Sequence, residues 1–553
     1  MTTMPKWTRP ARSAAVAVLL IGLTLWSVGT GLMTSGFTSS DASRHAMDGV
    51  LLHDLAAGGH FRDAYRYVVD YYGRYPALAI GYYPPFFAAV EAVVFSILPL
   101  ARESALATEL LFALVALLFW YMLVRSTHDR KHAVLASVFL MVNPLTVLWA
   151  REIMLEMPAL ALVIVTMFFL ERFSRAGRIA DAYGLAAGIG LAFLTKQTAI
   201  FVVPVALVTL AVRGKIRSLA RWAMLGPAAL AALLLAPWLA LTIALGGVNI
   251  HQSVGSLGET LGAPARWSFA AWSYYLLHVS EVVTLPVAVL AAGAAIIRPR
   301  NVGLYLVWLG VFYIFASVVS VKEPRYFYLG VPPICLLAAV GAVALFRWQP
   351  RRWGRVTRAF AYLVVGCALI WPVWQTARLK VPRIDGYDAA AHRMADLRGV
   401  GRILVGTYDD GAMVFYLRLH DPAQRLQVFR VSKLFYSTAI MEQYGFQEFV
   451  RTYDDMKNLL KEYGIRYVLV ERPVERNAYR KGSRLQRLLD DHLNSADFRP
   501  VSTVPVWTNL RSRPCSRLAA YEFVEAGPPR RQSIDIQILA IGKTLRVPLR
   551  RDD

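Results

Sequence analysis

A short segment near the start of the chain places three ionisable side chains on one helical face. In SSDASRHAMDGVLLHDL, Asp41, His45 and Asp48 follow one another at intervals of four and three residues, which is the spacing of one face of an α-helix. Carboxylate and imidazole groups exchange protons near neutral pH. The segment follows the first apolar run, so these groups would lie at a membrane surface and could act on a lipid-borne substrate.

The same segment also has a structural interpretation. Asp41 could cap the helix after Ser39 and Ser40, and the helix could lie on a surface with its apolar side turned inward. That apolar side would consist of Ala46, Val50, Leu51 and Leu55. Spacing alone leaves both interpretations open.

A second acid, Glu156, occurs in WAREIMLEMPAL, where a long apolar run begins. A carboxylate that enters a bilayer helix is costly to bury unless it is paired or hydrated, so Glu156 is a functional candidate. The neighbouring Arg151 and Glu152 could be solvated loop charges.

Cations mark two turns between apolar runs. Lys196 interrupts GLAFLTKQTAIFVVP, and Lys322 and Arg325 lie in VKEPRYFYLGVPP. Such groups could hold a phosphate at the membrane surface. Long basic side chains also snorkel to lipid headgroups, and this is the simpler interpretation of either turn alone.

Membrane helices must position these residues. Hydrophobic residues form 56% of the 553 residues, and apolar runs of membrane-spanning length recur up to residue 377. The predicted eleven spans are 14–33, 106–124, 132–148, 157–170, 180–194, 198–212, 222–245, 279–297, 302–320, 327–346 and 359–376. The run after Tyr82 contains Glu91 and is expected to form a helix at the outer membrane interface.

The basic residues predict the orientation. Of the 60 Lys and Arg residues, 20 lie in 53 residues of short loops on one side of the predicted spans, which the positive-inside rule assigns to the cytoplasm. The N-terminus is then cytoplasmic, and an odd number of spans places the 34–105 loop and the C-terminal part outside. The basic loops on one membrane side therefore account for the net charge of +23, and this charge does not indicate a nucleic-acid partner.

The remainder of the chain predicts a soluble domain. Residues 378–553 contain no apolar run of spanning length. RILVG at Arg402 to Gly406 and YVLV at Tyr467 to Val470 read as strands, with the helical segment DDMKNLLKEYG before the second. The order favours a small parallel or mixed sheet. The expected organisation is a membrane domain over 1–377 and an extracytoplasmic α/β domain over 378–553.

Five motifs occur along the chain in a familiar order. They are Asp41 after the first span, the aromatic-Pro-Pro segment YYPPFF, the run REIMLEMP, a Leu-Thr-Lys turn and a Pro-Arg-Tyr turn. The order resembles membrane glycosyltransferases of the GT-C class, in the group containing protein O-mannosyltransferases and the lipid A aminoarabinose transferase. The resemblance covers roughly residues 14–350. The family usually shows Asp-Glu where this chain has Asp41-Ala42, which leaves any role of the adjacent Glu in doubt.

This resemblance implies an α-helical polytopic glycosyltransferase of the bacterial plasma membrane. It would move a sugar, with inversion, from a polyprenyl-phosphate donor to an extracytoplasmic lipid, glycan or protein acceptor. Asp41 and Glu156 would be the catalytic acids, with Lys196, Arg325 and Tyr326 near the donor phosphate. Supporting residues would be His45, Asp48, Arg151, His251 and Arg266.

Metal dependence is open, because some members of the class bind a divalent cation and others do not. Candidate ligands are Glu156, His45 and His251, although they form no recognisable spacing motif.

Two other classes of function also stay open. A polytopic transporter or lipid-carrier binding protein would carry charges at helix ends, but internal repeats are typical of many carriers and none is evident here. A wall-polymer binding domain with a membrane anchor would need far fewer spans. Transport predicts that the glycosyl-phosphate bond stays intact.

Overall fold

The computed structural model describes residues 9–244, 247, 255, 259, 262–297, 301–347, 354–397, 401–438, 445–474, 480–511, 514–538 and 543–549. The chain divides into two compact units. The helical unit contains residues 1–33, 81–87 and 106–380, and the α/β unit contains residues 34–80, 88–105 and 381–553. The first predicted outer loop therefore folds mostly with the C-terminal part of the chain.

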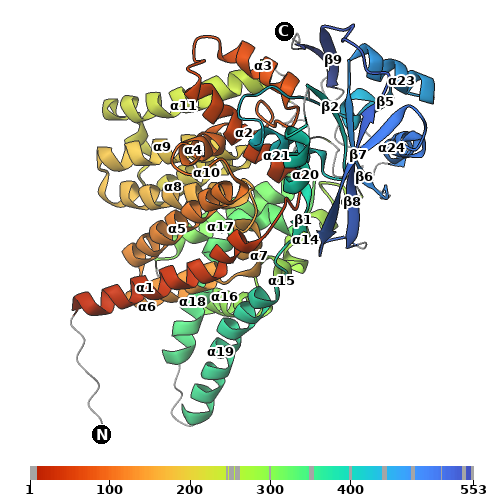
Figure 1. Cartoon of the computed structure of the whole chain (residues 1–553). Coiled ribbons are helices and arrows are strands. Elements are labelled where there is room, and N and C mark those ends of the chain that lie inside the picture. The colour runs from red at the N-terminus through yellow and green to blue at the C-terminus, as the bar shows by residue number, and fades with distance from the viewer. Residues whose placement is uncertain are drawn as a thin grey trace. The chain divides into compact units, whose positions relative to one another are not determined.

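The helical unit is built from apolar helices and short connecting turns (Figure 1). Its elements are α1 (Arg9–Ser27), η1 (Gly29–Met33), α5 (Arg102–Thr127, from residue 106), α6 (Arg130–Met141), α7 (Pro144–Ala150), α8 (Glu156–Ala176), α9 (Ile179–Thr195), η2 (Gln197–Phe201), α10 (Val202–Val212), η3 (Ile216–Ala220), η4 (Trp222–Met224), α11 (Leu225–Ala244), α14 (Phe269–Leu277), α15 (Val279–Val282), α16 (Leu285–Ile297), α17 (Gly303–Val318), η5 (Pro324–Gly330), α18 (Val331–Arg347) and α19 (Gly354–Arg378).

A helix covers each of the eleven predicted spans, but not every helix is long enough to cross a bilayer unaided. Within the described residues, six are long and apolar enough, and the bent pair α6 and α7 would make a seventh. Asn143 caps α7 and Pro144 follows at its first position, so the helix breaks there with a 61° bend. The predicted span 132–148 is thus two helices.

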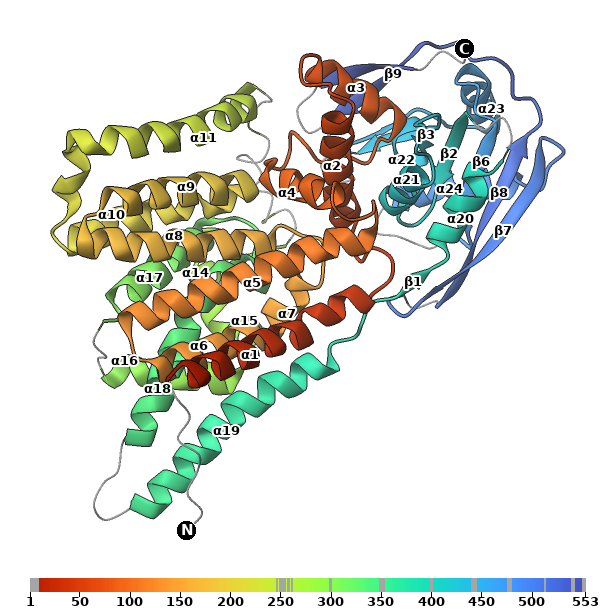
Figure 2. The ribbon, with the colours of Figure 1, turned by 60° about the vertical axis from the view of Figure 1, so that its left-hand side comes forward.

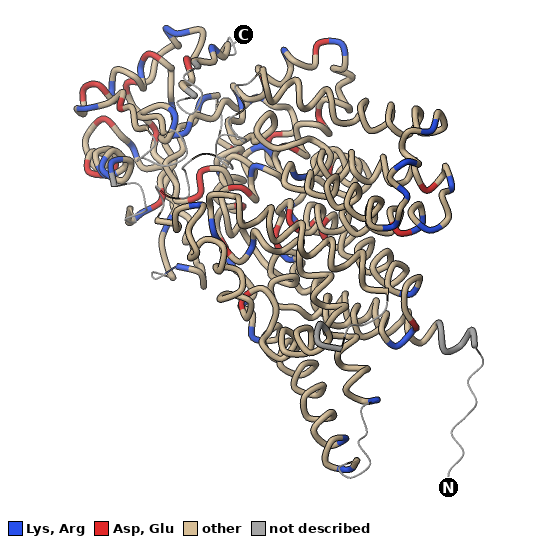
Figure 3. The backbone as a smooth tube through the Cα atoms, turned by 180° about the vertical axis from the view of Figure 1, so that it is seen from behind, with Lys and Arg blue, Asp and Glu red and all other residues tan. Residues whose placement is uncertain are grey.

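Basic loops lie together at one end of the helical unit. Arg175 donates to the Ser126 carbonyl at 3.2 Å, Arg213 lies 2.7 Å from Glu171, and Arg347 lies 3.6 Å from Asp129. Figure 3 shows Lys and Arg positions in blue where several helices end. Four of the six loops that the charge rule assigns to one membrane side, those at 125–131, 171–179, 213–221 and 347–358, are therefore joined by contacts in the structure.

Helices of the helical unit pack closely where small residues allow it. Gly341 of α18 lies so near the Leu290 carbonyl of α16 that a Cβ atom would come within 2.2 Å of that oxygen. Close approach at small residues is a usual means of packing helices in a bilayer, where lipid removes the hydrophobic drive for association.

The α/β unit combines three helices of the first loop with a mixed sheet. The loop helices are α2 (Ser40–Ala57), α3 (Ala64–Arg74) and most of α4 (Phe86–Phe95). The C-terminal elements are β1 (Ile384–Asp385), α20 (Tyr387–Ala395), β2 (Arg402–Gly406), α21 (Asp410–Leu419), β3 (Gln427–Arg430), α22 (Val431–Leu434), β4 (Tyr436–Thr438), β5 (Phe446–Glu448), α23 (Tyr453–Glu462), β6 (Tyr467–Arg472), α24 (Arg480–His492), β7 (Phe498–Thr508), β8 (Cys515–Phe523), β9 (Ser533–Ile538) and β10 (Lys543–Pro548).

The six-stranded sheet has the order β1-β7-β8-β6-β2-β3. Strand β2 pairs in parallel with β3 and β6, whereas the other pairs are antiparallel. The two predicted strands are therefore confirmed as neighbours in a mixed sheet. The predicted helix before β6 is α23, which begins with a capping box between Thr452 and Asp455 and is followed by Gly464 at φ +60°.

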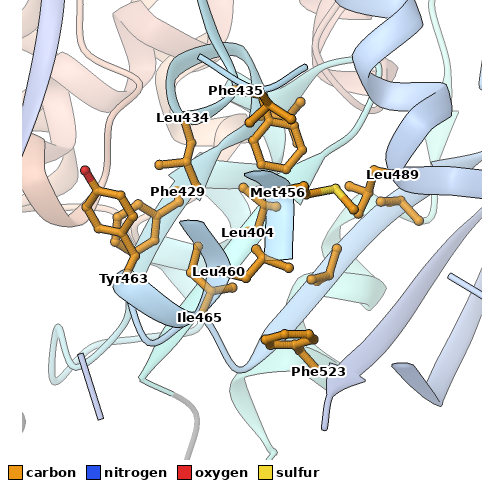
Figure 4. Close-up of a cluster of buried hydrophobic side chains, with 14 of the residues drawn as sticks. Leu404, Phe429, Leu434, Phe435, Met456, Leu460, Tyr463, Ile465, Leu489 and Phe523 are labelled. Atoms are coloured by element: carbon orange, nitrogen blue, oxygen red, sulfur yellow. The ribbon is translucent and has the colours of Figure 1, made fainter. Parts of the chain in front are cut away.

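A hydrophobic core holds the sheet against its helices (Figure 4). Leu404, Met456, Leu460 and Ile465 are fully buried in this cluster. Val69 and Tyr72 of α3 pack against the same cluster, so the first loop contributes to the core of the C-terminal domain.

Helix α2 packs against α21 in the same unit, and Figure 2 shows the two helices side by side. A Cβ atom on Gly411 would lie 2.5 Å from the Ser43 hydroxyl, so the two helices approach closely at a residue without a side chain. Most of α2 is buried, including residues on both of its sides. The expectation of an amphipathic surface helix is therefore wrong, because the C-terminal domain covers α2 and the sequence pattern of one segment cannot show this.

Candidate active site

Glu156 and Lys196 form an ion pair in the helical unit. Glu156 lies in the first turn of α8, and Lys196 ends α9 in an extended conformation. The Lys196 ammonium donates to Glu156 Oε1 at 2.7 Å, with side-chain exposures of 19% and 5%. A carboxylate at a helix N-terminus is also favoured by the helix dipole. The structure thus brings together two residues that the sequence analysis selected separately.

Arg325 and Tyr326 complete the polar part of this site. The Arg325 guanidinium donates to the Tyr326 hydroxyl at 2.9 Å and lies 2.8 Å from Glu323. It also lies over the Trp149 ring, 5.7 Å from its centroid. These contacts hold the guanidinium plane in place while leaving other N–H groups of the fork for further partners.

A cleft connects these residues. Glu156, Lys196, Thr198, Arg325 and Tyr326 line it, together with Phe312, Phe315, Ala316, Val319, Tyr328 and Leu329. Its empty space, including the part open to the outside, is about 420 Å³. The cleft therefore combines two cations with an aromatic and aliphatic wall. We call it the Lys196 cleft.

The Lys196 cleft lies far from the basic loops. Helix α8 begins at Glu156 and ends near Arg175 after 21 residues, which is about 30 Å at 1.5 Å per residue. Its first turn faces the cleft, and its last turn joins the basic cluster through Glu171 and Arg213. The acid and the cations of the cleft thus occupy the end of α8 opposite to the loops that the charge rule assigns to the cytoplasm.

Lys322 has a different role from the one expected. Its ammonium donates to three carbonyls near the end of α17, those of Ala316, Ser317 and Val319, at 3.0, 2.6 and 2.5 Å. Burial and the nearby Arg266 lower the pKa of Lys322 to about 8. The side chain therefore satisfies helix-end carbonyls, and the expectation that it joins Arg325 in holding a phosphate is wrong.

Arg151 is buried rather than solvated. Its side chain is 8% exposed, its Nε donates to the Ser27 carbonyl at 2.7 Å, and it packs against Gly31. The interpretation as a solvated loop charge is wrong, because α1 and η1 cover it. Glu109, which the sequence analysis missed, accepts from the Met154 backbone at 2.9 Å in the same region. An acidic residue inside the apolar run of α5 was the available signal.

Asp41 lies in the first turn of α2 in the α/β unit. Ser39, and not Asp41, is the N-cap, since its side chain accepts from the Ala42 backbone. The capping interpretation of Asp41 is therefore wrong. Its carboxylate lies 3.5 Å from the Arg44 guanidinium, and its side chain is 34% exposed. The Asp41 carboxylate is thus partly exposed and lies beside a cation.

His45 and Asp48 lie deeper on the same helix, with exposures of 3% and 4%. Asp48 Oδ1 accepts from the backbone of Ala79 and Ile80, each at 3.0 Å. Burial raises the pKa of Asp48 to about 7, although these two N–H groups oppose the shift. Burial and the charge of Asp48 also hold the pKa of Glu91 well above its usual range. Asp48 thus fixes the chain at residues 79–80.

Arg266 is not among the residues that line the Lys196 cleft. Arg266 lies in the turn before α14, where it donates to the Gly255 carbonyl at 2.7 Å. His251 lies outside the described residues. Over the ranges that the structure describes, no group of three or more His, Cys, Asp or Glu side chains could hold a metal ion.

One family model matches part of the chain. Residues 83–241 match the model of the family described as dolichyl-phosphate-mannose-protein mannosyltransferase. The matched region begins at the Tyr-Pro-Pro segment and includes Glu156 and Lys196. No curated protein sequence matches the chain.

Solved structures show the same fold over nearly the whole length. ArnT from Cupriavidus metallidurans bound to undecaprenyl phosphate is similar with a TM-score of 0.61 and 16% identity, over 94% of this chain and 100% of ArnT. Its apo structure gives a TM-score of 0.60. The arabinofuranosyltransferase AftD from Mycobacteria gives 0.50 and 17% identity, over 96% of this chain and 41% of AftD.

These matches agree with the order of motifs along the chain. The similarity to ArnT extends over both units, since it covers 94% of this chain. The chain has an ArnT-like fold, and residues 83–241 match the mannosyltransferase family model.

Proposed function

We propose that this protein transfers a sugar from a polyprenyl-phosphate donor to an acceptor on the extracytoplasmic side of a membrane. The observation that carries the proposal is the Lys196 cleft, in which Lys196 and Arg325 lie beside Glu156 and an apolar wall. A lipid phosphate needs both features, because its oxygens require cations and its chain requires hydrocarbon. The likeness to an ArnT structure that holds undecaprenyl phosphate supports this donor class.

The cleft has donors left for a phosphate. The Lys196 ammonium carries three N–H donors and Glu156 accepts one. The Arg325 fork has five donors, of which Tyr326 accepts one, and Glu323 lies beside it as a counter-charge. A phosphate bound here would gain charge-assisted hydrogen bonds, and the same cations would stabilise the phosphate as it leaves the sugar.

The reaction also needs a base for the acceptor. Asp41 would remove the proton of the acceptor hydroxyl as its oxygen attacks the anomeric carbon, which breaks the bond to the phosphate oxygen and inverts the configuration. Glu156 would position the Lys196 ammonium. This proposal requires no divalent cation. A cation near Glu156 or His45 would only add a positive charge.

A donor screen tests the proposal. The full-length protein in lipid nanodiscs would receive radiolabelled polyprenyl-phosphate sugars with a mixture of envelope glycolipids and glycans as acceptors. We expect release of polyprenyl phosphate together with label in an acceptor. Intact donor that merely crosses the bilayer of proteoliposomes would instead identify a transporter, and no use of any donor with normal folding would reject the proposed reaction.

A further inference from the structure

A second polar pocket lies within the α/β unit. Tyr72 of α3, Arg430 of β3 and Lys433 of α22 line it. Its other walls are apolar, from Pro76, Phe429 and Ile536 among others, and its empty space is about 290 Å³. We call it the Lys433 pocket. None of its residues belongs to the Lys196 cleft.

Arg430 presents an unused donor in the Lys433 pocket. Its two terminal nitrogens are engaged, one by the Pro76 carbonyl at 2.8 Å and one by Asp410 at 2.6 Å. Its Nε is buried with no hydrogen-bond partner among the described residues, in a side chain that is 7% exposed. A buried N–H of a charged group costs free energy unless a partner satisfies it.

Lys433 supplies a second, uncompensated cation. No described residue forms a hydrogen bond or ion pair with its ammonium. Burial lowers the pKa of Lys433 to about 8, and the positive charges of Arg430 and Arg44 lower it further. Arg430 and Arg44 already pair with Asp410 and Asp41, so a bound anion would chiefly stabilise the charge of Lys433.

The nearby carboxylates do not neutralise this pocket. Asp410 is already shared between Arg430 and the Ser432 hydroxyl, each at 2.6 Å. Asp409 caps α21 by accepting from the Ala412 backbone, and burial raises the pKa of Asp409 to about 7. The local balance therefore favours an external anion.

The residues that line the pocket come from α3, β3, α22, β9 and the turn after α3, and the charge of Arg44 on α2 acts on two of them. Arg44, which pairs with Asp41 at 3.5 Å, is close enough to lower the pKa of Lys433 and of Tyr72. Helices α2 and α21 also meet at Ser43 and Gly411. The positive charge of Arg44 therefore acts on both Asp41 and the Lys433 pocket, within the same compact unit.

We propose that the Lys433 pocket binds an oxyanion of the acceptor, a carboxylate or phosphate on a glycan or glycolipid, through Lys433, Arg430 Nε and the Tyr72 hydroxyl. The acceptor assignment rests on the proposed function, because it takes Asp41 as the base for the acceptor hydroxyl. The anionic group is a recognition element that stays unchanged, while the hydroxyl next to Asp41 accepts the sugar.

Ligand binding to the full-length protein in nanodiscs tests the pocket without any transferase assay. Glucuronate, glucose 1-phosphate and glucose would be titrated at constant ionic strength while thermal unfolding is recorded. We expect at least one of the two anionic sugars to raise the unfolding temperature saturably, and glucose not to do so. The stronger of glucuronate and glucose 1-phosphate identifies carboxylate or phosphate as the preferred group.

Substitutions locate the binding. Lys433→Met should weaken the anionic sugar at least about tenfold, and the exposed control Lys481→Met should leave its affinity unchanged. Lys433→Gln serves as the second variant if Lys433→Met does not fold. Both Lys433 variants should bind polyprenyl phosphate normally. Once a transfer assay exists, they should raise KM for an anionic acceptor with little effect on kcat.

Several outcomes would overturn the inference. If glucose raised the unfolding temperature as much as the anionic sugars, the Lys433 pocket would not be an anion site. Normal anion binding by both Lys433 variants would lead to the same conclusion. Loss of polyprenyl-phosphate binding in those variants would assign the pocket to the donor. A third outcome is that the protein binds the anionic sugars normally but transfers no sugar from any polyprenyl-phosphate donor. This result would reject the proposed function and the acceptor assignment, while the anion site itself would stand.

Discussion

Asp54 and Arg418 form a buried ion pair although 364 residues separate them in the sequence. Asp54 Oδ2 accepts from Arg418 at 3.0 Å and 2.6 Å, and the Tyr71 hydroxyl donates to the same oxygen at 2.8 Å. The two side chains are 5% and 4% exposed. This pair joins α2 of the first loop to α21 of the C-terminal domain inside the α/β unit.

Breaking this pair should destabilise the α/β unit. Asp54→Ala would leave the Arg418 charge buried without its partner, and we expect a loss of about 3–5 kcal/mol. Thermal unfolding and hydrogen exchange of α2 and α21 would measure it. The matched control is Asp535→Ala, which removes an exposed ion pair with Arg546 and should cost about 0–1 kcal/mol. Equal losses in the two variants would contradict this role of the pair.

Asp41→Asn tests the base. The amide keeps the size of the side chain and accepts hydrogen bonds but takes no proton, so we expect the transfer rate to fall by roughly two to four orders of magnitude. The unfolding temperature should change little, since Ser39 and not Asp41 caps α2. Asp63→Asn, at an exposed carboxylate, is the control. Near-normal turnover in Asp41→Asn would remove Asp41 from the mechanism.

The cations of the Lys196 cleft should act on donor binding. Lys196→Met or Arg325→Met should each weaken polyprenyl-phosphate binding by about 1.5–3 kcal/mol, the usual worth of a hydrogen bond to a charged group. Asp41→Asn should leave that binding largely unchanged, because the base acts on the acceptor. Lys215→Met in a basic loop is the control. If both cleft variants bound the donor normally, Lys196 and Arg325 would not bind its phosphate and would only contact lipid headgroups.

Orientation can be measured by labelling single cysteines in intact cells with a membrane-impermeant reagent, after replacement of Cys367 and Cys515. We expect labelling of cysteines at Ser40, Gln197 and Arg393. Cysteines at Ser126 and Gly214 should react only after permeabilisation, because the basic loops should be cytoplasmic. The reverse pattern would place the Lys196 cleft on the cytoplasmic side and contradict the proposed extracytoplasmic reaction.

The buried Asp48 predicts a specific pH dependence. Its pKa is raised to about 7, so its neutral form is favoured in the folded state. Protonated Asp48 therefore contributes to the free energy of unfolding. This contribution is fully present below the pKa of about 3.9 that Asp48 has in the unfolded chain, and it is lost as pH rises through about 7. The high pKa of Glu91 acts in the same direction. In the wild type, the free energy of unfolding should be larger at pH 5 than at pH 8. Asp48→Asn should make this difference smaller.

Thermal unfolding of wild type and Asp48→Asn across this pH range would measure the effect. The control is Asp70→Asn, at a partly exposed carboxylate of the same unit, which should leave the pH profile of the wild type unchanged. An identical profile in Asp48→Asn and wild type would show that Asp48 does not titrate in this range.

The sequence by itself determined the class of protein and the position of most elements. Apolar run length marks helices wherever they lie, because every backbone group in a bilayer must be satisfied within the segment. The Lys and Arg content of the loops also predicted that basic loops lie at the same end of the helical unit. That prediction needs only the composition of each loop. Glu156, Lys196 and Arg325 could be selected as charges at the ends of apolar runs for the same local reason.

The roles of individual charges were decided only by the tertiary structure. Lys322 and Arg325 lie three residues apart, yet Lys322 binds helix-end carbonyls and Arg325 lines the Lys196 cleft. Arg151 is buried under α1 and η1, and α2 is enclosed by a domain encoded more than 300 residues later. Burial and pairing depend on contacts between distant segments, so the pattern of one segment cannot contain them. The folded chain alone places Glu156 against Lys196 and Asp54 against Arg418.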